Sequence, residues 1–110
     1  MRFESVSQVF ELLEGRFDPA AAEGLEAVFQ FLIEGEGGGQ WLVAIQDQAC
    51  RVAAGVHAAP SLSLALSAEH WLKIVNGEMA AMPAYMTGKL KATGNIMLAA
   101  KLGKLFRLKL

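Results

Sequence analysis

The sequence predicts an α+β fold in which helices at both ends of the chain cover one face of a mostly antiparallel sheet of four or five strands. Apolar residues recur at helical spacing near both termini and alternate with polar residues through most of the middle, which is typical of strands. No internal repeat or linker separates these segments. Residues 1–110 therefore fit one domain with one hydrophobic core.

The N-terminal segment is predicted to form a short amphipathic helix. Ser5 and Gln8 make the capping-box pattern, and the apolar residues that follow keep helical spacing until Gly15 ends the helix. Residues 18–19, Asp-Pro, repeat the start signal, a cap residue followed by proline at the first helical position. We therefore expect a second, brief helix over residues 20–23.

Three strands follow, and their spacing predicts an antiparallel meander. Residues 25–33 place apolar side chains at odd positions, with Gln30 among the polar residues of the opposite face. The second strand begins at Trp41, and the third covers residues 49–55. Residues 47–48, Asp-Gln, offer the tight turn between them.

Pro60 separates the meander from a fourth strand and a helix. Leucine alternates with serine and alanine over residues 61–66, so the inner face of this strand is entirely leucine. Ser67 can cap the helix that follows, and Asn76 with Gly77 ends it as left-handed cap residues do. All four strands thus share one apolar face.

The last third of the chain is predicted to contain a short helix, a fifth strand and a final helix. The short helix begins near Pro83 and breaks at Gly88, and alternation resumes over residues 89–93. Asn95 is the expected N-cap of a helix over residues 96–107. Helices from both ends of the chain can then cover the same apolar face.

The chain is rich in apolar residues for its size. Hydrophobic residues make up 54% of the sequence, and a small domain buries a smaller share of its surface than a large one. The surplus should line a cavity, cover an interface or remain exposed as a patch. Met79, Met82 and Met86 form a methionine stripe beside Tyr85, and methionine suits an adaptable apolar wall. Composition thus predicts an apolar partner.

Charge is distributed unevenly along the chain, although the formal net charge is only −1. Residues 1–50 carry two basic and nine acidic side chains, and residues 51–110 carry eight basic and two acidic ones. Lys101, Lys104 and Arg107 belong to an acid-free tail that can approach an anionic membrane surface or simply remain solvated. The net charge and the lack of interleaved basic and aromatic residues disfavour nucleic acid as a partner.

Several function classes find little support in the residues. No apolar run is long enough to span a membrane, and Glu4 with no apolar stretch after it predicts no cleaved signal. The lone Cys50 favours a reducing compartment, hence the cytoplasm, and lacks the spacing of a metal site. His57 and His70 have no nucleophile or carboxylate at a recognisable spacing. We therefore expect no catalytic residue, no metal and no cofactor.

Segments near the C-terminus resemble the sterol carrier protein 2 type lipid-binding domains. They are residues 77–79 (GEM), 84–95 (AYMTGKLKATGN) and 98–102 (LAAKL). The last three residues, 108–110, differ from a peroxisomal address, which needs a small residue where Leu108 stands. The chain is therefore most similar to compact, bacterial-type stand-alone members. Shorter matches to the family lie earlier in the chain: Phe17-Asp18-Pro19, Phe29-Gln30-Phe31 and Trp41.

The resemblance implies a five-stranded, mostly antiparallel sheet whose helices enclose a hydrophobic tunnel for a fatty acid, an acyl-CoA, a sterol or an isoprenoid-like lipid. It implies binding and transfer without catalysis. Lys89 and Lys91 could then meet a carboxylate or a CoA phosphate at the tunnel mouth. The expected ligand contacts are apolar side chains from the strands and helices: Phe29, Phe31, Trp41, Val43, Leu64, Trp71, Val75, Met79, Met82, Tyr85, Met86, Leu90, Met97, Leu98, Leu102 and Phe106.

Two other functions remain open. The same cavity could hold an isoprenoid or quinone-like intermediate for a partner enzyme, or the surplus apolar surface could form a homodimer. A small esterase or thioesterase would need a nucleophile and a base that the sequence does not place together. Copurified enzymes, or a cavity filled by the protein's own side chains, would favour the accessory subunit over the carrier.

Overall fold

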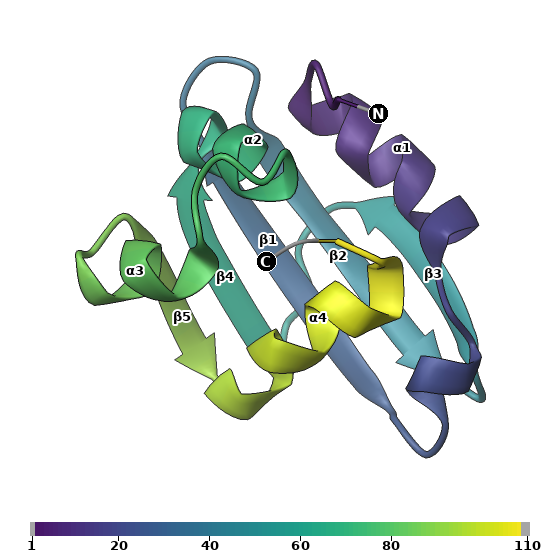
Figure 1. Ribbon diagram of the computed structural model, residues 1–110. Helices are drawn as coiled ribbons and strands as arrows, with labels where there is room; N and C mark the ends of the chain where they lie inside the picture. Colours follow the sequence, from purple (N-terminus) through teal and green to yellow (C-terminus); the bar gives the residue numbers. More distant parts are fainter. Residues whose placement is uncertain (1, 109–110) are drawn as a thin grey trace.

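A computed structural model describes residues 2–108, which form an α+β fold with a five-stranded sheet (Figure 1). Four α-helices lie over one face of the sheet in this part of the chain: α1 (Val6–Arg16), α2 (Ala68–Val75), α3 (Ala81–Met86) and α4 (Ala99–Phe106). The strands are β1 (Ala27–Glu34), β2 (Gly39–Gln46), β3 (Ala49–Ala54), β4 (Leu62–Ser67) and β5 (Leu90–Gly94). Two 3₁₀ turns complete the order: η1 (Ala20–Ala22) and η2 (Ile96–Leu98). None of these helices is long and apolar enough to cross a membrane.

β1 lies at the centre of the sheet, whose strand order is β3-β2-β1-β4-β5. β1, β2 and β3 pair antiparallel as the predicted meander, and β4 pairs antiparallel with β5. β1 and β4 pair in parallel, with Phe31 opposite Leu64. The predicted fold class and the mostly antiparallel sheet are therefore confirmed. The central parallel pairing is a feature that alternation alone does not predict.

The side chain of Gln30 in β1 binds the segment that connects β3 to β4. Its side chain is only 2% exposed, although alternation assigns it to the polar face of the strand. Nε2 donates to the carbonyls of Trp41 (2.9 Å) and Gly55 (3.0 Å), and Oε1 accepts from the His57 backbone N–H (2.7 Å). The connection between β3 and β4 therefore lies against Gln30, which is buried because this backbone covers it.

The helices and the sheet share one apolar core in which Phe10 of α1 is central. Its ring packs edge-on against Phe31 (centroids 5.2 Å apart) and stacks on Trp41 (4.9 Å) and Trp71 (5.6 Å). The inner face of β4 is entirely leucine, as predicted, and its leucines are buried. Large aromatic side chains thus fill the space between α1, α2 and the sheet.

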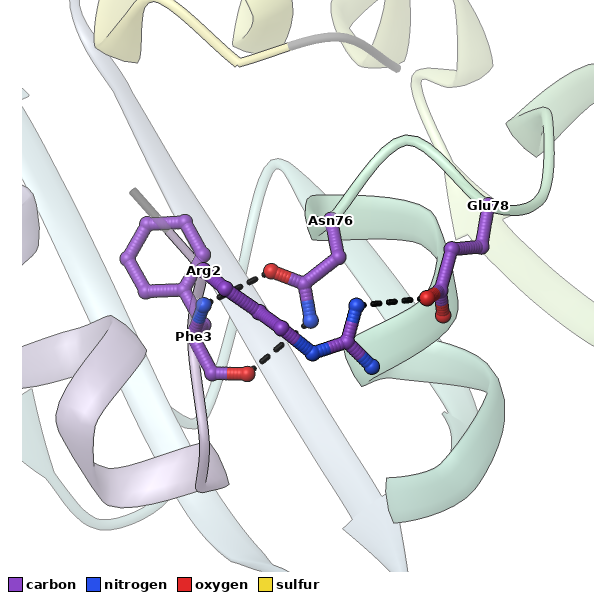
Figure 2. Close-up of polar contacts among 4 residues, drawn as sticks. All are labelled: Arg2, Phe3, Asn76 and Glu78. Atoms are coloured by element: carbon purple, nitrogen blue, oxygen red, sulfur yellow. Dashed lines mark hydrogen bonds and ion pairs between the residues drawn. The ribbon is translucent and has the colours of Figure 1, made fainter.

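Asn76 ties the N-terminal segment to the end of α2 (Figure 2). Its Oδ1 accepts from the Phe3 backbone N–H (2.7 Å), and its Nδ2 donates to the Phe3 carbonyl (2.9 Å). Arg2 adds an ion pair with Glu78, and the hydrogen bond from Arg2 lowers the pKa of this exposed carboxyl below its ordinary value. Asn76, predicted only to end a helix, also fixes where the chain enters α1.

The C-terminal segment differs most from the prediction. Asn95 makes no side-chain cap, and the residues after it form η2 before α4 begins at Ala99. The Asn95 backbone N–H donates to the Ser61 carbonyl (2.8 Å), which keeps Asn95 paired with the sheet instead of in cap geometry. The prediction also places the start of α3 too late: α3 begins at Ala81, two residues before Pro83.

Other boundaries shift by one or two residues. α1 continues through Gly15 to Arg16, and η1 ends at Ala22 instead of residue 23. β1 begins at Ala27 instead of residue 25, and β2 begins at Gly39, two residues before Trp41. Lys109 and the end of the tripeptide compared with a peroxisomal address lie outside the described residues.

Candidate ligand-binding pocket

A pocket of about 730 Å³ opens between α3, β5 and the segment that runs from η2 into α4. This volume falls within the usual range for small-molecule sites. Leu64 of β4 and Leu90 and Ala92 of β5 line it from the sheet. The other lining residues come from α3, η2, α4 and the residues after α4: Ala81, Met82, Tyr85, Ile96, Met97, Ala99, Ala100, Gly103, Lys104 and Leu108.

Alternation along β5 decides which of its side chains reach the pocket. Ala92 pairs with Leu64 of β4, and both line the pocket, as does Leu90 two residues earlier. Lys91 falls between them on the opposite face of the sheet. Lys89 and Lys91, the lysines expected at a tunnel mouth, do not line this pocket.

Helix α4 has one face in the core and one face in the pocket. Ala100 and Lys104, one turn apart, both line the pocket. The other face of the helix is buried in the core: Leu102, Leu105 and Phe106. α4 is therefore the wall that separates the pocket from the core.

Several contacts hold the C-terminal end of α4 in place. Arg16 of α1 donates from its guanidinium to the carbonyls of Phe106 (3.1 Å) and Arg107 (2.6 Å). Arg107 adopts a left-handed conformation (φ 54°), and the Leu108 N–H donates to the Gly103 carbonyl (3.0 Å). The chain thus folds back after the helix and brings Leu108 to the edge of the pocket.

Within residues 2–108, the pocket lining is apolar apart from one cation and one phenol. Lys104 is the only charged side chain among these described lining residues, and Tyr85 supplies a hydroxyl. Neither of the two salt bridges found within residues 2–108 involves Lys104, and the sequence contains no acid after Glu78. The arrangement suits a molecule with an apolar body and an anionic end.

The side chains expected to contact a lipid fall into three groups. The pocket brings together Leu64, Met82, Tyr85, Leu90 and Met97. A second group lies in the core or packs against it, outside the pocket lining: Phe29, Phe31, Trp41, Val43, Trp71, Val75, Met79, Leu98, Leu102 and Phe106. Met86 is exposed on α3 and also lies outside the lining.

The small residues of the pocket are those that sequence reasoning missed. Ala99, Ala100 and Gly103 leave open space beside α4, and Ala92 does so on the sheet. These residues are hard to predict from the sequence because small side chains add little to the apolar periodicity on which the prediction rests. A group of small residues on one face of a helix whose other face carries leucine and phenylalanine is the feature that could have revealed them. The other lining residues that the sequence analysis did not name among the expected ligand contacts are Ala81, Ile96, Lys104 and Leu108.

Other reactive side chains lie away from the pocket. His57 Nδ1 accepts from the Ala59 backbone N–H (3.0 Å), which gives His57 a structural role between β3 and β4. Neither His57 nor His70 lines the pocket. Over residues 2–108, no three His, Cys, Asp or Glu side chains lie together so that they could hold a metal ion.

Cys50 of β3 is expected to react slowly with alkylating reagents. Burial, with the nearby Glu14 carboxylate as the second cause, raises the pKa of the Cys50 thiol to about 11, so the thiol is protonated near neutral pH. Between pH 8 and pH 10 the iodoacetamide rate of the folded protein should keep rising, whereas that of the denatured chain levels off above its pKa of about 8.5. A plateau near pH 9 in the folded protein would contradict this assignment.

Comparison with known proteins identifies relatives over nearly the whole chain. A family model described as the SCP-2 sterol transfer family matches residues 8–107. Hydroxysteroid dehydrogenase-like protein 2 of Rattus norvegicus is 32% identical over 107 residues, which cover 94% of this chain and 20% of that protein. The chain thus spans about a fifth of the length of this protein and of its Mus musculus counterpart.

Two solved structures of sterol carrier protein 2 like 2 from Aedes aegypti share the fold at 28% identity. The crystal structure has a TM-score of 0.72 and covers 90% of this chain and 91% of the other. The solution structure of the palmitated protein has a TM-score of 0.70 and covers 94% and 95%. Because the family model matches residues 8–107, nearly the whole chain, the chain belongs to the SCP-2 sterol transfer family.

Proposed function

We propose that the protein binds one lipid with a long apolar chain in the pocket between α3, β5 and α4, and releases this lipid unchanged. The observation that carries the proposal is the pocket lining, whose described residues are apolar apart from Lys104 and the Tyr85 hydroxyl. Membership in the SCP-2 sterol transfer family supports lipid transfer as the role. The palmitated mosquito protein, 28% identical to this chain, supports a fatty acid as the ligand.

The lining also suggests how a fatty acid lies in the pocket. Its chain packs against the sheet at Leu64, Leu90 and Ala92, where apolar surface is removed from water. Its carboxylate lies beside Lys104 at the solvent edge of α4. This orientation buries the tail and leaves the charged end hydrated and paired, which avoids the cost of burying an unpaired carboxylate.

The expected affinity suits a carrier. A chain of roughly 16 carbons gains about 12 kcal/mol from burial, at about 0.8 kcal/mol per CH₂. Ordering of the chain and desolvation of its polar end remove part of this gain, and a net value of about 8 kcal/mol corresponds to a Kd of about 1 µM. A lipid held at this strength can still be released.

Displacement of a fluorescent fatty acid by palmitate tests the proposal. Palmitate should compete with a Kd of about 1 µM, and hexadecanol, which lacks the charge, should bind about fivefold more weakly. Lys104→Gln should abolish that preference, whereas Lys101→Gln, on the same helix but outside the lining, should keep it. A clean apo mass of protein purified without detergent, together with no displacement by either lipid, would contradict lipid binding.

A second role for the same pocket is to present a lipid-like intermediate to an enzyme. The observation that favours it is that the curated relatives are about five times longer than the matched region, so this region works beside other protein segments there. In this role the chain remains non-catalytic and the partner performs the reaction. Stable copurification with an enzyme, and lipid that leaves only when that enzyme is present, would favour presentation over free transfer.

A further inference from the structure

Exposed apolar side chains concentrate beside the pocket opening. Seven large apolar residues are exposed within residues 2–108, and five of them lie in α3 and η2, the two segments that flank β5. The other two, Leu12 and Val56, lie on α1 and between β3 and β4. The five side chains, 39–81% exposed, are named here the apolar rim: Met82, Tyr85, Met86, Ile96 and Met97.

The charges carried by the segments around the apolar rim are all positive. Lys101 and Lys104 are exposed on α4, directly after η2, and Lys89 is exposed immediately before β5, between the two parts of the rim. Lys91 is also exposed but lies on the opposite face of the sheet. The last acid of the sequence, Glu78, is paired with Arg2. Apolar side chains next to lysines match a surface that offers acyl chains beneath anionic headgroups.

We propose that the apolar rim and its flanking lysines dock the pocket opening onto an anionic lipid bilayer. The rim inserts at the level of the acyl boundary, and Lys101 and Lys104 contact the headgroups. The pocket that the rim partly lines then opens toward the bilayer, so a lipid can pass between them with little exposure to water. The docking itself needs no bound ligand, and only this last step rests on the proposed function.

Charge favours a bilayer over a second copy of the chain. In a two-fold interface formed by the rim, the segments around the rim would bring only lysines from each copy, Lys101 and Lys104 among them. The sequence provides no acid after Glu78 to neutralise them, and juxtaposed like charges weaken association. An anionic bilayer supplies the missing negative charge.

Flotation with lipid vesicles tests the docking surface. The protein should float with vesicles of phosphatidylcholine and phosphatidylglycerol, much less with phosphatidylcholine alone, and less as salt rises. Met97→Glu should weaken binding to the anionic vesicles at least about tenfold. Val56→Glu, which places the same charge at a similarly exposed site (61%) away from the rim, should leave vesicle binding nearly unchanged.

A lysine variant separates membrane docking from lipid binding. Lys101 does not line the pocket, so Lys101→Glu should keep palmitate affinity and the unfolding curve while binding anionic vesicles at least about fivefold more weakly. Arg51→Glu on β3, at the opposite edge of the sheet from β5, is the control. Equal flotation with neutral and anionic vesicles, or equal losses for Met97→Glu and Val56→Glu, would overturn the proposal. A dimer that Met97→Glu dissociates, without vesicle binding, would assign the rim to a second copy.

Discussion

Ala92→Phe is expected to weaken palmitate binding by at least about tenfold, or about 1.4 kcal/mol. Ala92 lies on the pocket face of β5, opposite Leu64, where the proposed acyl chain packs. A phenyl ring at this position occupies that space. Phenylalanine is well tolerated in strands, and the ring points into open volume, so the sheet should persist. Titration of palmitate at matched protein concentration measures the effect.

Thr93→Phe is the matched control for Ala92→Phe. Thr93 is the next residue of β5, is exposed, and points to the opposite face of the sheet, away from the pocket. Thr93→Phe introduces the same ring into the same strand, so this variant should bind palmitate as the wild-type protein does. If Ala92→Phe keeps wild-type affinity with an unchanged unfolding curve, the acyl chain does not lie against β5.

Phe10→Ala is expected to lower the free energy of unfolding by about 3–5 kcal/mol, because a buried phenylalanine is truncated in a packed core. Phe10 is buried and contacts the rings of Phe31, Trp41 and Trp71. These rings lie outside the pocket lining. The folded fraction of the variant should therefore bind palmitate with wild-type affinity. Urea denaturation measures the loss of stability, and a separate palmitate titration of the folded variant at low temperature measures its affinity.

Leu12→Ala provides the comparison on the same helix. Leu12 is 37% exposed, and its truncation should cost less than about 1 kcal/mol. A large loss of palmitate affinity in folded Phe10→Ala, with none in Leu12→Ala, would place the lipid within the aromatic core, as an enclosed tunnel would require. The Phe10 side chain would then contribute both to the stability of the fold and to palmitate binding.

The elements that the sequence predicts well are those with local causes. Ser5 accepts from the Gln8 N–H (3.2 Å) and Ser67 from the His70 N–H (3.1 Å), so both helix starts follow from residues three positions apart. The strands are also predicted from neighbouring residues, because apolar and polar side chains alternate along each of them. Asn95 offers the same local signal, but its backbone is bound to Ser61, which is distant in sequence. Long-range pairing therefore overrides capping at that point.

The position of the pocket depends on tertiary packing that a periodic pattern does not contain. Phe29 and Phe31 carry the strongest apolar signal of β1, yet both are buried in the core, where Phe10 of another element covers Phe31. The pocket lies where Ala100 and Gly103 leave space unfilled. The family resemblance of residues 84–95 predicts the kind of ligand, but not which of the apolar side chains enclose it.

The most direct test of the proposed site is an NMR measurement on protein labelled with ¹³C at the methionine methyl groups. With ¹³C-labelled palmitate at saturation, we expect intermolecular NOEs from the acyl chain to Met82 and Met97, which line the pocket. The Met86 methyl, exposed on the same helix as Met82 but outside the lining, should show none. NOEs confined to the core rings of Phe31 and Trp71, or none to Met82 and Met97, would contradict lipid binding in this pocket.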